Sequence, residues 1–213
     1  MNKLLRYLFF LLIVKPLTFF LLGVNVRNRQ KFPTQGPAIV IANHNSHLDT
    51  LVLMSLFPQR LLPYLHPVAA ADYFLRSNFL AWFATKIIGI IPIRRTRTGK
   101  QDPLQPISEA LKQNAIIIFF PEGTRGEPEQ LAQFKSGIAH LAERHPLVKI
   151  VPVFTYGMGK ALPKGTALLV PLTIDIYIGD SLQWHDNKTQ FMQDLEHEFT
   201  QLREQAYVPK FDD

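Results

Sequence analysis

Residues 37–49 read PAIVIANHNSHLD, an apolar run that passes directly into a polar one. The first six of these residues are apolar, which is typical of a short strand buried on both faces of a sheet. Residues 48–56 return to apolar side chains at helical spacing. This stretch therefore predicts a strand, a polar turn and a helix, the unit from which α/β sheets are built.

The same alternation of strand and helix patterns continues along the chain. Further strands are predicted at residues 67–70, 115–120, 148–155 and 167–178, and further helices at residues 74–88, 106–114, 134–144 and 188–205. No internal repeat and no Gly-rich or Ser-rich linker interrupts this pattern. We therefore expect residues 31–213 to form one α/β domain.

The first 30 residues differ from the rest in composition. Residues 7–14 and 17–24 are apolar, Lys15 and Pro16 interrupt them, and basic residues flank both ends. A membrane span needs about 20 apolar residues, and a charge in mid-bilayer costs roughly 2.5–3.5 kcal/mol. Residues 1–30 are therefore predicted to be a membrane-anchoring helical segment that lies in the interface and bends at Pro16.

Three alternatives remain for this segment: a single span, a signal peptide and a buried core helix. Positive charge on both flanks favours keeping both ends on the cytoplasmic side. We therefore expect the protein at the inner (cytoplasmic) membrane, with the domain on its cytoplasmic face.

The overall composition limits the classes of function. The chain of 213 residues has a net charge of +6, which implies acidic partners such as nucleic acid, anionic lipid headgroups or phosphorylated substrates. The absence of Cys excludes disulfides, thiolate nucleophiles and thiolate metal sites.

The polar run after the first strand contains His44 and Asp49. On one regular helix an offset of five residues turns by about 140°, so these side chains meet only if His44 ends the strand and Asp49 begins the helix. In that arrangement Asp49 orients His44, and His44 acts as a general base on a substrate hydroxyl. The alternative is an ordinary turn in which Asn45 or Ser46 caps the helix.

Two other chemistries of this run are less well supported. His44, His47 and Asp49 miss the His-x-His-x-Asp-His pattern of metallo-β-lactamase-type hydrolases by one residue, so we expect no metal site. Ser46 is not part of a Gly-x-Ser-x-Gly nucleophile elbow, so we expect no serine nucleophile.

A second polar run, FPEGTR at residues 120–125, follows the strand predicted before it. Gly123 permits a tight turn and the close approach of a ligand to the backbone. Arg125 suits bidentate recognition of a phosphate, and Glu122 can accept a hydrogen bond from a substrate hydroxyl. Taken alone, this run is also compatible with an ordinary turn that carries a surface ion pair.

Together the two runs resemble the glycerolipid acyltransferase family that makes phosphatidic acid. His44 and Asp49 match the family's His-x-x-x-x-Asp motif, and residues 120–125 match its Phe-Pro-Glu-Gly-Thr-Arg motif at every position. Residues 89–95 look like the second motif and residues 151–153 like the fourth. The resemblance implies a glycerolphosphate acyltransferase-like fold, with a mixed central sheet flanked by helices and an N-terminal hydrophobic membrane-anchoring helix.

The resemblance also implies a role for each matching residue. His44 deprotonates the acceptor hydroxyl as it attacks an acyl thioester, and Asp49 orients His44. The implied acceptor- and phosphate-binding residues are Arg95, its alternative Arg94, Glu122, Gly123, Thr124 and Arg125. No bound cofactor is expected, and the acyl donor is acyl-CoA or acyl carrier protein.

Two departures from the family pattern leave the acceptor open. Pro92 stands where the family often has an aromatic or aliphatic residue, and residues 69–74 lack the Lys and Glu often found there. The acceptor is expected to be 1-acyl-sn-glycerol-3-phosphate, with a lyso-ornithine lipid or another lysophospholipid as the alternative. The expected partners are this acceptor, the thioester donor and the membrane surface, and not nucleic acid. The rival hypothesis, a non-catalytic basic membrane-binding protein, gives no reason for the pair of His44 and Asp49.

Overall fold

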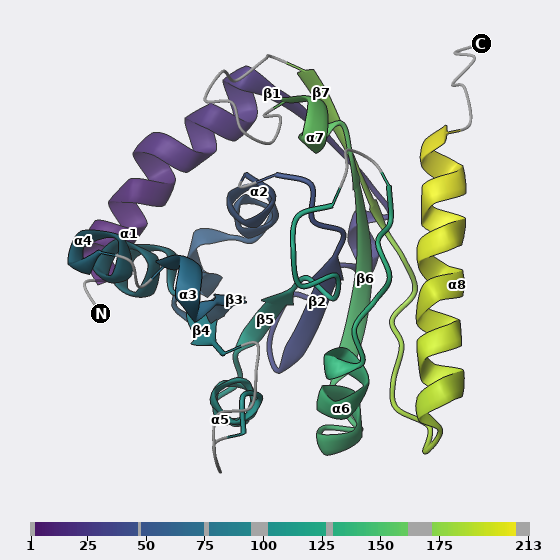
Figure 1. Cartoon of the computed structure of the whole chain (residues 1–213). Coiled ribbons are helices and arrows are strands. Elements are labelled where there is room, and N and C mark those ends of the chain that lie inside the picture. The colour runs from purple at the N-terminus through teal and green to yellow at the C-terminus, as the bar shows by residue number, and fades with distance from the viewer. Residues whose placement is uncertain are drawn as a thin grey trace.

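The computed structural model describes residues 3–46, 48–74, 77–94, 102–126, 130–161 and 172–207. Within these ranges seven strands form one mixed sheet with helices on both faces (Figure 1). The strands are β1 (Leu22–Arg27), β2 (Ala38–Ala42), β3 (Leu65–Ala70), β4 (Ile91–Ile93), β5 (Ile116–Phe119), β6 (Lys149–Tyr156) and β7 (Leu172–Ile178), in the spatial order β1-β7-β6-β2-β5-β3-β4. The predicted α/β fold is therefore confirmed.

The helical elements connect these strands. The α-helices are α1 (Lys3–Phe9), α2 (Asp49–Ser55), α3 (Ala71–Phe74), α4 (Asn78–Trp82), α5 (Gln105–Lys112), α6 (Gly137–Arg144), α7 (Met158–Ala161) and α8 (Lys188–Tyr207). Three π-helical segments are η1 (Phe10–Val14), η2 (Leu17–Leu21) and η5 (Phe83–Ile88). Two 3₁₀ segments are η3 (Arg29–Lys31) and η4 (Gln59–Tyr64).

Strand β2 lies near the middle of the sheet and positions the polar runs. It pairs in parallel with β5 on one side and with β6 on the other, and all five of its residues are buried. Ile41 lies opposite Phe119, and Ala42 lies opposite Val153. Because parallel strands end at the same edge of a sheet, the residues after β2 and after β5 leave that edge side by side.

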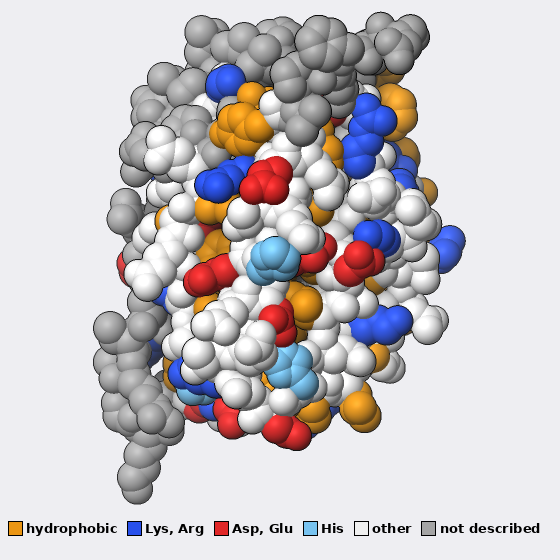
Figure 2. All heavy atoms as spheres, turned by 90° about the vertical axis from the view of Figure 1, so that its right-hand side faces the viewer, with side chains coloured by type: hydrophobic (Ala, Val, Ile, Leu, Met, Phe, Trp, Pro, Cys, Tyr) orange, Lys and Arg blue, Asp and Glu red, His pale blue; other side chains and the backbone are white. Residues whose placement is uncertain are grey.

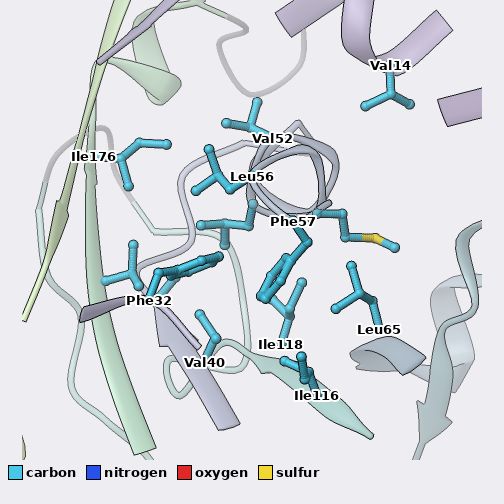
Figure 3. Packing of buried hydrophobic residues seen from close by; sticks show 14 of the residues in the cluster. Val14, Phe32, Val40, Val52, Leu56, Phe57, Leu65, Ile116, Ile118 and Ile176 are labelled. Atoms are coloured by element: carbon cyan, nitrogen blue, oxygen red, sulfur yellow. The ribbon is translucent and has the colours of Figure 1, made fainter. Parts of the chain in front are cut away.

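Two hydrophobic cores cover the two faces of the sheet. Figure 3 shows the first core, where Val40 of β2 and Ile118 of β5 lie beneath Val52, Leu56 and Phe57 of the α2 region. The second core packs the other face against α5, α6 and α8. Alternate residues of β2 enter opposite cores, which explains why its sequence is apolar without interruption.

The N-terminal segment is helical from Lys3 to Leu21 and passes directly into β1. The predicted bend at Pro16 does not interrupt the helix, because Pro16 keeps helical dihedral angles of −58° and −43°. The helical segment predicted over residues 1–30 is wrong after Leu21, since Leu22–Arg27 form β1 and pair with β7. None of the helices in the described ranges combines the length and the apolar composition that a membrane span requires.

Arg6 links this N-terminal helix to the domain through hydrogen bonds. Its guanidinium is buried, and Nη2 donates hydrogen bonds to the carbonyl oxygens of Leu65 at 2.8 Å and Ile88 at 2.9 Å. A Cβ atom on Gly89 would lie 2.7 Å from the guanidinium, so the left-handed turn at Gly89 gives Arg6 its space. Burial lowers the pKa of Arg6 to about 10.

Arg6→Met is expected to destabilise the fold, because it leaves two carbonyl oxygens without their charged donor. We expect the free energy of unfolding to fall by about 2–4 kcal/mol, as measured by urea unfolding followed by circular dichroism. Lys3→Met, at an exposed position on the same helix, is the control and should change it by less than about 0.5 kcal/mol. Equal small losses in both variants would contradict the role of Arg6.

Candidate active site

His44 and Asp49 meet at the carboxyl end of β2. His44 Nδ1 lies 2.9 Å from Asp49 Oδ2, and the Asp49 side chain is fully buried whereas that of His44 is 20% exposed. The same Oδ2 atom accepts hydrogen bonds from the backbone N–H groups of Asn45 at 2.6 Å and Ser46 at 2.8 Å. The carboxylate is therefore fixed at the start of α2, where the helix dipole favours negative charge.

This geometry selects one form of the imidazole. A carboxylate beside Nδ1 favours the tautomer that carries its proton there, which leaves Nε2 as the atom that accepts a proton. The ring of Phe120 stacks on His44 with centroids 4.2 Å apart and an angle of 23° between the planes. Phe120 therefore contacts one face of the imidazole, and Asp49 fixes its orientation through Nδ1. A general base requires such a fixed orientation.

The run at residues 120–126 holds the backbone of His44 on both sides. The N–H group of His44 donates to Glu122 Oε1 at 3.0 Å, and the carbonyl oxygen of His44 accepts from the N–H group of Gly126 at 2.9 Å. The two polar runs are therefore one unit in space, although they are 78 residues apart in the sequence.

Asn43 connects this unit to β6, a role that the sequence pattern did not predict. Its Nδ2 atom donates to the carbonyl oxygen of Thr155 at 2.9 Å, and its Oδ1 accepts from the N–H group of Thr155 at 2.7 Å. The side chains of both residues are buried. The sequence feature that could have indicated this role is the position of Asn43 as the first polar residue after a buried strand.

Glu122 points into the protein and not out from the edge of the sheet. It is only 3% exposed, its Oε1 atom receives the N–H group of His44, and its Oε2 atom is buried without a hydrogen-bond partner among the described residues. Burial raises the pKa of Glu122 to about 7, and the hydrogen bond from the His44 backbone opposes this rise. In this conformation Glu122 positions His44, which differs from the predicted contact with a substrate hydroxyl.

The titration of Glu122 predicts a stability change with pH. Its pKa of about 7 exceeds the ordinary 4.5, so the folded protein keeps a proton that the unfolded chain releases, and stability falls as pH rises through this window. The total loss is on the order of 3 kcal/mol. Glu122→Gln has no carboxyl to titrate and should not show this loss. The unfolding free energy of the variant should therefore rise relative to that of the wild type as the pH increases from 4.5 to 7.

Urea unfolding across this pH range measures the difference between wild type and variant. Glu204→Gln, at an exposed position on α8, is the matched control and should follow the wild type throughout. A parallel pH dependence in Glu122→Gln and wild type would contradict a buried carboxyl that takes up a proton.

The turn after Glu122 exposes its backbone. Gly123 has a φ of +72°, and a Cβ atom there would lie 2.8 Å from Lys135 Nζ. Gly123 and Thr124 are exposed and Arg125 is half-buried. Lys135 thus adds a cation to the predicted acceptor- and phosphate-binding residues. The sequence feature that indicates it is the stretch FKSG at residues 134–137.

The remaining predicted residues are placed in part. Arg94 is exposed directly after β4, whereas Arg95 and His47 lie outside the described residues. Within the described ranges no group of three or more His, Asp or Glu side chains is arranged to hold a metal ion.

Comparison with known proteins shows which proteins this chain resembles. Residues 23–156 match the family model described as Acyltransferase, a range that includes both polar runs. The chain belongs to the acyltransferase family. This match confirms the resemblance that the motifs indicated.

Two curated relatives show the extent of the similarity. The chain is 31% identical over 145 residues to 1-acyl-sn-glycerol-3-phosphate acyltransferase LPAT1, chloroplastic, of Arabidopsis thaliana, covering 67% of this chain and 38% of the relative. It is 36% identical over 134 residues to 1-acyl-sn-glycerol-3-phosphate acyltransferase alpha of Mus musculus, covering 61% and 44%. The matched region is therefore less than half the length of either acyltransferase.

A solved structure shares the fold of this chain. The crystal structure of the 1-acyl-sn-glycerophosphate (LPA) acyltransferase PlsC from Thermotoga maritima matches with a TM-score of 0.76 at 20% sequence identity. The match covers 98% of this chain and 80% of that protein.

Proposed function

We propose that this acyltransferase moves a fatty acyl chain from an acyl thioester to the free hydroxyl of 1-acyl-sn-glycerol-3-phosphate, giving phosphatidic acid. The observation that carries the proposal is the contact between His44 and Asp49, held in place by the FPEGTR run of an acyltransferase family member. A buried carboxylate behind a partly exposed His is the arrangement that activates a hydroxyl without an enzyme nucleophile.

The proposed reaction is a direct transfer. His44 Nε2 takes the proton of the acceptor hydroxyl while the hydroxyl oxygen attacks the thioester carbonyl carbon. Asp49 stabilises the imidazolium that forms. When the tetrahedral intermediate collapses, the carbon–sulfur bond breaks and His44 returns the proton to the thiolate, so that one ester and one thiol are produced.

Recognition of the acceptor requires cations near the same edge of the sheet. In the proposal Arg95, or Arg94 in its place, and Arg125 bind the phosphate, because guanidinium groups recognise phosphate in a bidentate manner. Gly123 and Thr124 form the exposed turn that contacts the acceptor, and Lys135 adds its charge beside Gly123.

The membrane is the proposed source of the acceptor. An interfacial N-terminal helix spares the lysolipid a full transfer into water, which costs about 0.8 kcal/mol for each CH₂ group of its chain. We expect the protein at the cytoplasmic face of the inner membrane, because basic residues flank both ends of its apolar segment. The donor is acyl-CoA or acyl carrier protein, and no bound cofactor takes part in the proposed step.

An acceptor panel tests this function. Membranes that contain the protein receive labelled acyl-CoA or acyl carrier protein together with lysophosphatidate, a lyso-ornithine lipid or lysophospholipids with larger headgroups. Labelled phosphatidic acid is the expected product. Transfer to a different lysolipid alone would replace the acceptor and keep the chemistry, whereas transfer to none of them would refute the proposal.

A further inference from the structure

The positive charge of this chain is concentrated in two stretches of sequence. Residues 1–48 and 73–101 together contain 12 of the 23 Lys and Arg residues and none of the 17 Asp and Glu residues. The rest of the chain therefore has more acidic than basic residues. Figure 2 shows the α8 side of the molecule, where acidic and basic side chains are interspersed.

Elements from these two stretches pack against each other in space. The ring of Phe9 in α1 contacts the ring of Phe83 in η5, with centroids 5.2 Å apart and an angle of 88° between the planes. Helix α1 packs against η5, which continues α4, and these elements lie on the side of the sheet opposite α8 (Figure 1). The segment of α4 and η5 is thus a direct neighbour of the predicted anchoring helix.

Both neighbours expose large apolar side chains. Phe79 and Trp82 of α4 are 73% and 43% exposed, and their ring centroids lie 6.1 Å apart. The N-terminal helix exposes several more, which include Leu4, Leu8, Leu11, Leu12, Ile13, Phe19 and Phe20. A soluble protein rarely exposes so many together, and aromatic side chains of this kind favour the boundary between lipid and water.

The charges on these elements select the partner. Within α1, η1, η2, α4 and η5, and at the Lys15–Pro16 junction, every charged residue is basic. Lys3 and Lys86 are exposed, one in each neighbour. Apolar side chains bordered by Lys match the acyl chains and the anionic headgroups of a lipid surface.

We propose that α4 and η5 form one docking surface with the N-terminal helix, and that Phe79 and Trp82 insert into an anionic lipid bilayer. This inference deepens the proposed function, since it adds a second membrane contact from within the domain itself. Two contacts fix the rotation of the domain about the axis of the N-terminal helix, which one interfacial helix alone leaves free.

The two Trp residues of the chain allow a direct test. Trp184 packs against Phe191 of α8, away from the proposed surface, so Trp184→Phe leaves Trp82 as the reporter. On vesicles of phosphatidylcholine and phosphatidylglycerol we expect Trp82 fluorescence to shift to the blue and to be quenched by lipids with brominated acyl chains. Trp82→Phe, which leaves Trp184, should show neither change.

Vesicle affinity provides the second measurement. Phe79→Ser should weaken binding to the same vesicles by about tenfold or more, because the variant has no Phe ring to bury in the bilayer. Leu147→Ser is the matched control, since Leu147 is 87% exposed in the loop before β6 and should not affect binding.

Two results would overturn the inference. One is vesicle-bound protein whose Trp82 fluorescence is unchanged, and the other is equal vesicle affinity for Phe79→Ser and Leu147→Ser. Neither measurement uses acyl transfer, so failure of this inference is distinguishable from failure of the proposed reaction.

Discussion

His44→Ala is expected to lower kcat for acyl transfer by about 100-fold to 10,000-fold, the range typical of a lost general base. The fold should remain, because Ala keeps the N–H and carbonyl groups through which Glu122 and Gly126 hold this position. The side chain is partly exposed and loses mainly its stacking on Phe120.

The chain offers a matched control for this variant. His185 Nε2 lies 2.9 Å from Asp194 Oδ2, so it belongs to a second His–Asp pair, on the surface near α8. His185→Ala should leave kcat unchanged, and circular dichroism should show both variants folded. If His44→Ala keeps wild-type kcat, or if both variants lose activity equally, His44 is not the base.

Asp49→Asn is expected to lower kcat by about 100-fold or more while the protein still folds. Among the described residues, the three hydrogen bonds of the Asp49 side chain all use Oδ2, and Oδ1 has no partner. An Asn with its oxygen in place of Oδ2 keeps these bonds, so the substitution removes chiefly the negative charge. Without that charge the imidazolium formed during the reaction is less stable.

Steady-state kinetics separates this effect from a loss of binding. An interaction made only in the transition state lowers kcat and leaves KM for the acceptor unchanged. Asp194→Asn is the matched control from the surface pair and should change neither constant. A normal kcat in Asp49→Asn, or a rise in KM alone, would contradict the charge-stabilising role.

The local parts of the site were predictable from the sequence. His44 and Asp49 are five residues apart, and the apolar patterns on both sides place a strand before them and a helix after them. Few conformations of that arrangement bring the two side chains into contact. The fold class followed for the same reason, because buried parallel strands and their connecting helices have distinct patterns.

The long-range parts were not predictable in this way. The bond from His44 to Glu122 depends on β2 lying beside β5, and the bond from Asn43 to Thr155 depends on β2 lying beside β6. Hydrophobic periodicity gives the elements of a sheet and not their order. The inward direction of Glu122 follows from this order and therefore had no local signal.

Strand β1 was missed for a related reason. Leu22 to Val24 continue an apolar run that reads as helix, and only pairing with β7 makes them a strand. The role predicted for Arg95 remains a prediction, because this residue lies outside the described part of the chain.

In the proposed reaction His44 promotes a direct transfer from thioester to acceptor, with no acyl-enzyme intermediate. The decisive experiment follows one labelled acyl thioester, with purified protein in vesicles and lysophosphatidate present. We expect labelled phosphatidic acid, one thiol released for each acyl chain transferred, and no label on the protein at any time. Absence of phosphatidic acid, or label that appears on the protein before it appears on the lipid, would contradict it.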